Sequence, residues 1–135
     1  MVKKFFITAI IICMTSLAGC QKSPINGDLD GRWQIITIET GEDIEEVKDL
    51  QLYYNFSLHI CNLSYYGGSY TDGIFNYDSN LIHIHFPYIT NVVGMSRLSQ
   101  YGIYSNPVEF KVEYLDKKKL ILKEGDNVVI TLRKF

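Results

Sequence analysis

The sequence lacks the excess of positive charge that is typical of domains that bind nucleic acid. Its 135 residues carry 13 Lys and Arg against 15 Asp and Glu, which gives a formal net charge of −2. We therefore expect no nucleic-acid partner. Intrinsic disorder is excluded as well, because it requires high net charge and few aromatic residues, whereas 13% of this chain is aromatic. The length predicts one domain.

The motifs of common enzyme classes are also missing. The chain contains no Gly-x-Ser-x-Gly, no phosphate-binding glycine loop and no His-Glu-x-x-His. Carboxylates are dense only between Glu42 and Asp49, where no apolar pocket residues surround them as acid catalysis requires. We assign that segment to a solvated loop or helix face, and we expect neither an enzyme nor a cofactor.

A long apolar run is absent too. The run from Phe5 to Met14 is too short for a membrane-spanning helix, which needs about 20 apolar residues. It follows Lys3 and Lys4 and leads to the small residues of Leu17-Ala18-Gly19-Cys20. A basic start, a short apolar core and small residues before a cut site predict a secretory signal peptide.

Leu17-Ala18-Gly19-Cys20 resembles the bacterial lipobox. The resemblance implies that residues 1–19 are removed and that Cys20 is acylated, which anchors the protein to a lipid membrane. Two acyl chains give stable anchoring, whereas a single chain is marginal. The alternative is an ordinary signal peptide followed by an incidental cysteine.

The residues after Cys20 bear on the location of the anchored protein. Gln21 stands where Asp is the usual inner-membrane retention signal, so the resemblance implies the outer membrane. Acidic residues arrive late, at Asp28 and Asp30, whereas an early acidic run is similar to a surface-export signal. This favours the periplasmic face over the cell surface. After processing, Cys61 is the only remaining thiol, and we interpret it as a small buried hydrophobe.

The remainder of the chain alternates between strand-like runs and turns. Period-two alternation of apolar and polar residues predicts antiparallel strands, and Gly, Asn, Asp and Pro mark the breaks. The predicted strand regions are residues 31–39, 52–63, 73–77, 81–86, 108–115, 120–123 and 128–135. Residues 42–50 and 92–101 have apolar spacing for one or two helical turns each.

Sequential strands without covering helices point to a closed barrel or a sandwich. We predict an all-β fold, an antiparallel up-and-down barrel of about eight strands with one or two short helical turns. Residues 20–30 would form the lipidated tether, and residues 31–135 the barrel domain.

Gly31-Arg32-Trp33 opens the first strand and resembles the start of lipocalin-like (calycin) barrels. The resemblance implies that Trp33 plugs the barrel floor and that a basic side chain of the last strand, Arg133, packs over it by cation–π contact. The whole pattern is similar to small lipocalin-like lipoprotein domains of Bacteroidetes.

Alternation also predicts which side chains point into the barrel. An interior of aromatic and branched aliphatic side chains suits a small-molecule pocket. The candidate ligand-facing residues are Phe56, Ile82, Ile84, Phe86, Phe110, Val112 and Tyr114. His83 and His85 then face solvent, so we expect no metal site, although these two with His59 could be imagined as a zinc site.

Tyrosines gather in two predicted connections. A tyrosine combines a large apolar body with a polar end, which suits a binding surface. The candidate rim residues are Tyr65, Tyr66, Tyr70, Tyr101 and Tyr104, with ordinary half-buried packing as the alternative. The leading functional hypothesis is a small apolar or amphipathic ligand inside the barrel. The alternative is a filled barrel whose tyrosine-rich loops contact a protein or a glycan.

Overall fold

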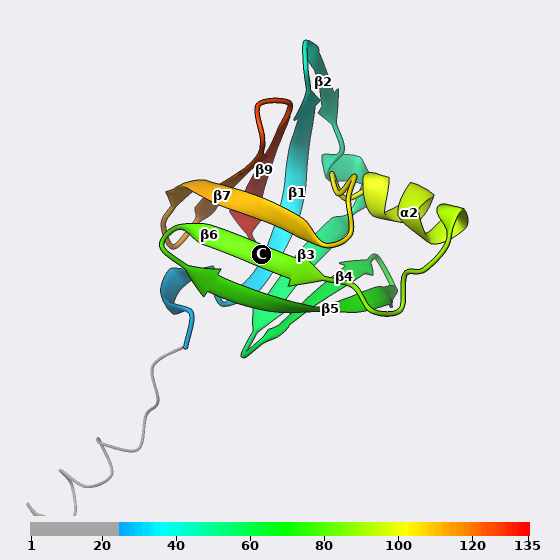
Figure 1. The fold of residues 1–135 in the computed structure, drawn as a ribbon. Helices are drawn as coiled ribbons and strands as arrows, with labels where there is room; N and C mark the ends of the chain where they lie inside the picture. The colour runs from blue at the N-terminus through cyan, green and yellow to red at the C-terminus, as the bar shows by residue number, and fades with distance from the viewer. Residues whose placement is uncertain (1–24) are drawn as a thin grey trace, which may run out of the picture.

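A closed β-barrel forms the body of the protein (Figure 1). The computed structural model describes residues 25–135, so the predicted leader and Cys20 lie outside the described residues. Within that range, no helix has both the length and the apolar character needed to cross a membrane. The strands are β1 (Gly31–Thr40), β2 (Asp43–Glu46), β3 (Leu52–Ser57), β4 (Ile60–Tyr65), β5 (Gly68–Asp78), β6 (Leu81–His85), β7 (Val108–Leu115), β8 (Lys119–Glu124) and β9 (Val128–Lys134).

Eight of these strands make the barrel, and each pairs antiparallel with its neighbours. The order runs from β1 through β3 to β9, and β1 closes the ring by pairing with β9 from Trp33–Lys134 to Thr40–Val128. The first half of β1 pairs with β3, and its second half pairs with the short strand β2. The predicted antiparallel barrel of about eight strands is confirmed, with β2 as an additional hairpin arm.

Two local predictions differ from the structure. Residues 42–50 form β2 and a 3-10 turn, η2 (Lys48–Leu50), where the sequence predicts a helical segment. Gly41, at φ +63°, turns the chain back so that residues 43–46 pair with β1, and this pairing overrides the weak local helical pattern. The predicted single run over 52–63 is a hairpin that turns at Leu58, where φ is +55°.

The helical prediction over residues 92–101 is confirmed as α2 (Val92–Ser99). Asn91 caps this helix, since its side-chain oxygen accepts a hydrogen bond from the Gly94 amide at 2.8 Å. The N-terminal 3-10 turn, η1 (Gly27–Leu29), lies just before β1. Leu29 is fully buried, so the packed region begins before Gly31, the first residue of the predicted barrel domain.

Strand direction separates the two ends of the barrel. We call the end where β1 begins the floor; it carries η1, the β3–β4, β5–β6 and β7–β8 turns, and the C-terminus. The opposite end is the mouth. It carries the β1–β2 hairpin, the β4–β5 and β8–β9 turns, and the long β6–β7 connection that includes α2. In Figure 1, the β1–β2 hairpin projects at the top and α2 lies at the right.

Side chains pack the space inside the barrel. Phe56 contacts Phe75 edge-on, with 5.2 Å between the ring centroids. The ring centroid of Tyr54 lies within 6.5 Å of those of Phe56 and Phe110. Burial of this apolar surface is the main stabilising contribution to the fold. The core therefore extends from the floor through the middle of the barrel.

Candidate functional site at the barrel mouth

The floor is closed by a buried tryptophan whose indole N–H is hydrogen-bonded. Trp33 is fully buried, and its Nε1 donates a hydrogen bond to the Leu29 carbonyl at 2.8 Å. The Lys134 ammonium lies 4.4 Å from the centre of the Trp33 ring. A Cβ at Gly31 would lie 2.7 Å from that ammonium, so the glycine leaves room for the lysine.

The basic partner of Trp33 is therefore Lys134, and the assignment of this role to Arg133 is wrong. Lys134 is the direct cross-strand partner of Trp33, whereas Arg133 pairs with Gln34 and points to the other side of the strand. Its Nε donates to Gln34 Oε1 at 3.0 Å. The pairing of β1 with β9 differs by one residue from the expected register, and this places Lys134 rather than Arg133 beside Trp33.

Six of the seven candidate ligand-facing side chains are buried in the barrel. They are Phe56, Ile82, Ile84, Phe86, Phe110 and Val112. Tyr114 is the exception: it is 47% exposed, and its hydroxyl donates to Asp116 at 2.7 Å. The β7–β8 register shifts between Val112 and Tyr114, and such a bulge breaks the alternation on which the inward prediction depended.

The mouth is covered by the β6–β7 connection. Leu98 and Ile103 are fully buried, and Tyr101 is 2% exposed. The Tyr54 hydroxyl donates to the Tyr101 carbonyl, and the Tyr101 hydroxyl donates to the Ser64 carbonyl at 3.1 Å. The sequence predicts a ligand in the barrel interior. These side chains lie between that interior and the mouth.

The candidate rim tyrosines divide into two kinds. Tyr70 stacks on Tyr101 at 6.0 Å, donates to the Gly94 carbonyl at 3.2 Å, and has the Arg97 guanidinium 4.1 Å above its ring. These contacts fix α2 to the barrel, so Tyr70 and Tyr101 have a packing role. The exposed members are Tyr65, Tyr66 and Tyr104, which are 40%, 76% and 48% exposed.

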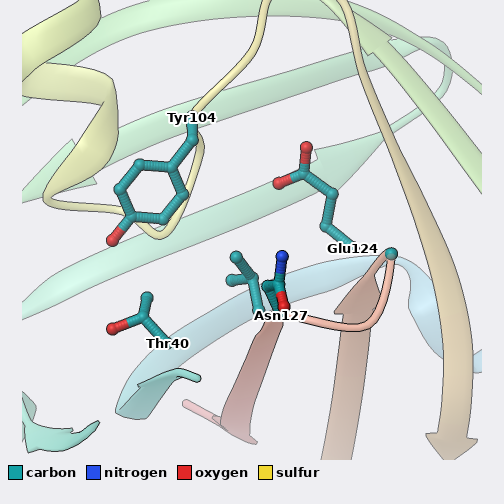
Figure 2. A pocket seen from close by; sticks show the side chains of 6 residues that line it. Thr40, Tyr104, Glu124 and Asn127 are labelled. Carbon is teal, nitrogen blue, oxygen red and sulfur yellow. The ribbon is translucent and has the colours of Figure 1, made fainter. Parts of the chain in front are cut away.

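Tyr104 borders a pocket of about 460 Å³ at the mouth. Figure 2 shows the side chains that line the pocket, which come from the end of β1, the β6–β7 connection and the β8–β9 hairpin. Thr40 ends β1, Glu124 ends β8, and Val128 begins β9. The mouth pocket is lined by Thr40, Tyr104, Glu124, Gly125, Asn127 and Val128.

Backbone contacts hold the walls of this mouth pocket together. The Gly41 amide donates to the Asn127 carbonyl at 2.8 Å, which ties the β1–β2 hairpin to the β8–β9 turn. Among the lining residues, only Tyr104 was a candidate from the sequence. Glu124 and its neighbours carried no local signal, because a strand that ends in a charged residue before a glycine turn is ordinary.

Glu124 is the chemically distinctive residue of the mouth pocket. Its Oε1 accepts a hydrogen bond from the Ser105 hydroxyl at 3.1 Å. Its Oε2 is buried and has no hydrogen-bond partner in the described part of the chain. A buried acceptor without a donor costs about 1–3 kcal/mol, and more when it is charged. That oxygen has almost no accessible surface, so a donor group on a ligand in the pocket would relieve the cost once the carboxylate turns toward it.

The carboxylates of Glu45 and Glu124 also act on the Tyr104 hydroxyl. Burial raises the pKa of Tyr104, and the nearby negative charges of Glu45 and Glu124 raise it further. Both effects disfavour a phenolate, so Tyr104 is a neutral hydroxyl at physiological pH. The pocket thus combines an aromatic wall, an aliphatic wall at Val128 and an acceptor-rich side.

The remaining candidate groups lie apart from the mouth pocket. His83 and His85 are exposed on the outer face of β6, opposite Glu109 and Ile74 in the strand register. Within residues 25–135, no group of three or more metal-ligating side chains is arranged to hold an ion. Cys61 is fully buried, and burial raises the pKa of its thiol, which disfavours the reactive thiolate.

Comparison with known proteins identifies relatives of this architecture. A family model described as a lipocalin-like domain matches residues 13–135. A lipocalin-like protein from Bacteroides uniformis ATCC 8492 has a similar structure, with a TM-score of 0.66, 23% identity, and coverage of 81% of this chain and 100% of that one. An uncharacterized protein from Bacteroides eggerthii DSM 20697 has a TM-score of 0.62 and 18% identity, covering 78% of this chain and 98% of that one. No curated protein matches the chain.

Proposed function

Because the chain belongs to the family of lipocalin-like domains, we propose that it acts by binding, and that it holds a small amphipathic ligand in the mouth pocket. The observation that carries this proposal is the combination, in one pocket, of the Tyr104 and Val128 walls with the unpartnered oxygen of Glu124. A volume of about 460 Å³ lies within the range of small-molecule sites.

The mouth pocket is a better ligand site than the barrel interior. Phe56, Phe110 and their neighbours already pack against one another there, and Leu98 and Tyr101 cover the way in. A ligand inside the barrel would have to displace these side chains and lose their packing. A ligand in the mouth pocket adds contacts without disturbing the core.

The proposal includes anchoring through acylated Cys20 to the outer membrane, on its periplasmic face, with the cell surface as the alternative. The Asn26 side chain donates to the Leu58 carbonyl at 2.9 Å, which attaches the start of the described chain to the floor. Residues 20–25 can span at most about 20 Å when extended. Anchoring would therefore hold the floor near the membrane and turn the mouth pocket away from it.

Binding is tested with a neutral probe, 2-phenylethanol, titrated into the purified full chain in a nonionic detergent, with detergent alone as the blank. We expect saturable binding with a Kd of about 1 mM, as suits so small a probe. Thr40→Phe fills the mouth pocket and should abolish binding, whereas Thr90→Phe, in an exposed connection, should not. Trp33 fluorescence should stay unchanged, because the probe does not enter the barrel. Equal binding by both variants would contradict the proposal.

Anchoring is tested by fractionating bacteria that express the full chain. Cys20→Ser should release the protein from membranes, because it removes the acylated atom. Cys13→Ser is the matched control, and it should leave the protein membrane-bound. Equal membrane retention of both variants would contradict lipidation at Cys20.

A second candidate function is contact with a protein or glycan through an exposed apolar patch at the mouth. Tyr88, Val92 and Val93 are 78%, 84% and 72% exposed, and apolar groups this exposed in one place often mark interaction surfaces. A photo-cross-linking residue at position 93 should give a discrete adduct in cells, whereas one at Lys111, on the outer face of β7, should not.

A further inference from the structure

Resting on the proposed function, we infer that the ligand of the mouth pocket is a small organic cation. Its primary ammonium group binds Glu124, and its apolar body packs on Tyr104 and Val128. The class therefore comprises primary amines with a compact aromatic or aliphatic body. Fatty acids and other carboxylates are excluded from it.

The hydrogen-bond partners of Glu124 favour an ammonium group as its ligand. Ser105 satisfies one carboxylate oxygen, and the other lacks a donor among the residues of the described structure. None of the six lining residues is basic, so the pocket wall supplies no countercharge of its own. An ammonium group brings both a donor and a positive charge, and charge-assisted hydrogen bonds are the stronger kind.

The neighbouring hairpin carries an excess of negative charge. Residues 39–49 contain six acidic residues and one lysine. Thr40 of that segment lines the mouth pocket, and Glu45 lies close enough to raise the pKa of Tyr104. The resulting negative potential attracts cations to the pocket and repels anions.

The aromatic wall of the mouth pocket also suits a cation with an apolar body. Tyr104 is 48% exposed, so part of its ring is available to a ligand. A cation near an aromatic face gains electrostatic stabilisation, and the ring also covers an apolar body. A metal ion is a poorer match, because Glu124 is the only carboxylate in the lining and a metal site requires several ligands.

The test compares three probes that share one phenyl-ethyl skeleton: 2-phenylethylamine, 2-phenylethanol and 3-phenylpropanoate. Each is titrated by calorimetry into the purified full chain at pH 7. We expect the amine to bind about tenfold more tightly than the alcohol, and the carboxylate to show no saturable binding. The amine preference should weaken as ionic strength rises, because the potential of the hairpin is screened.

Two variants assign the preference to Glu124. Glu124→Gln should weaken amine binding about tenfold and alcohol binding much less, because the amide oxygen of Gln still accepts a hydrogen bond from a hydroxyl group. Glu113→Gln removes the same charge from the outer face of β7, where its carboxylate pairs with Lys111 at 3.6 Å, and should leave amine binding unchanged. Circular dichroism confirms that both variants are folded before titration.

The outcomes separate this inference from the proposed function. If the amine and the alcohol bind equally well, and Thr40→Phe abolishes both, the pocket binds ligands but the cation inference is overturned. If amine binding survives both Thr40→Phe and Glu124→Gln, the cation does not use this site and the inference also fails. If none of the probes binds, both the inference and the proposed function fail.

Discussion

The floor and the mouth of this barrel differ in how many hydrogen bonds they provide to a carboxylate. At the floor, Asp116 accepts hydrogen bonds at 2.7 Å from the Tyr114 hydroxyl and from the amides of Lys118 and Lys119. At the mouth, Glu124 accepts one bond from Ser105 and leaves a buried oxygen unpartnered. Both residues are next to hairpin turns of the same β-meander, so their local context does not explain the difference.

The contrast extends to the aromatic residues. Trp33 at the floor is fully buried and hydrogen-bonded, and Lys134 covers its ring. Tyr104 at the mouth is half exposed beside a pocket. Satisfied polar groups contribute stability, whereas each buried polar atom without a partner calls for a separate explanation, such as a functional role. The floor therefore stabilises the barrel, and the mouth is the place where we propose that a ligand binds.

The largest effect is expected at the floor. Trp33→Ala should lower the free energy of unfolding by about 3–5 kcal/mol, because it removes a large buried aromatic side chain. Urea unfolding followed by circular dichroism measures the loss. A loss below about 1 kcal/mol would contradict the role of Trp33 as the floor plug and weaken the contrast between the two ends.

A smaller loss is expected where the mouth connection packs onto the core. Gly102 has φ +79°, and a Cβ there would lie 2.6 Å from Ile130 Cδ1. Gly102→Ala should therefore cost about 1–3 kcal/mol, since it combines backbone strain with a steric clash. Gly125→Ala is the control: φ is +54°, but no atom lies within 4 Å of the added methyl. Equal losses in thermal unfolding would mean that the connection packs only loosely.

The mouth carboxylate should carry a stability cost. Glu124→Met replaces the carboxylate, one oxygen of which lacks a partner, with an apolar chain of similar length. We expect a gain of about 1 kcal/mol in the free energy of unfolding, together with loss of amine binding. Chemical denaturation and calorimetry on one preparation measure both quantities. A destabilisation with unchanged amine binding would place Glu124 with the structural residues and remove the contrast.

The smallest effect concerns Asp116, which is exposed. The hydrogen bond from Tyr114, followed by those from the amides of Lys118 and Lys119, lowers the pKa of Asp116. Its contribution to stability is therefore present above the unfolded pKa of about 3.9 and is lost as pH falls through the lower folded pKa. Carboxyl NMR titration measures this pKa, and Tyr114→Phe should move it upward. An unchanged pKa in that variant would show that the backbone amides alone hold the carboxylate.

The main departures from the sequence predictions have long-range causes. The bulge in β7 exposes Tyr114, and a one-residue difference in register gives Lys134 the role predicted for Arg133. Local periodicity reports which residues share a face, but the partner strand decides where a register shifts. Residues 43–46 likewise form a strand because β1 offers a partner, although their own spacing favours a helix.

The antiparallel strands and their turns could be predicted from the sequence alone, because alternation and turn chemistry are local properties that each strand carries separately. Residues 108–112, for example, predict the buried face of β7 without knowledge of any neighbour. The mouth pocket, in contrast, could not be predicted from local patterns. Thr40, Tyr104 and the β8–β9 hairpin, which carries Glu124 and Val128, are far apart in the chain, and closure of β1 on β9 brings Thr40 next to that hairpin. The unpartnered oxygen of Glu124 is a property of that assembly, since no local pattern specifies whether a donor will lie beside it.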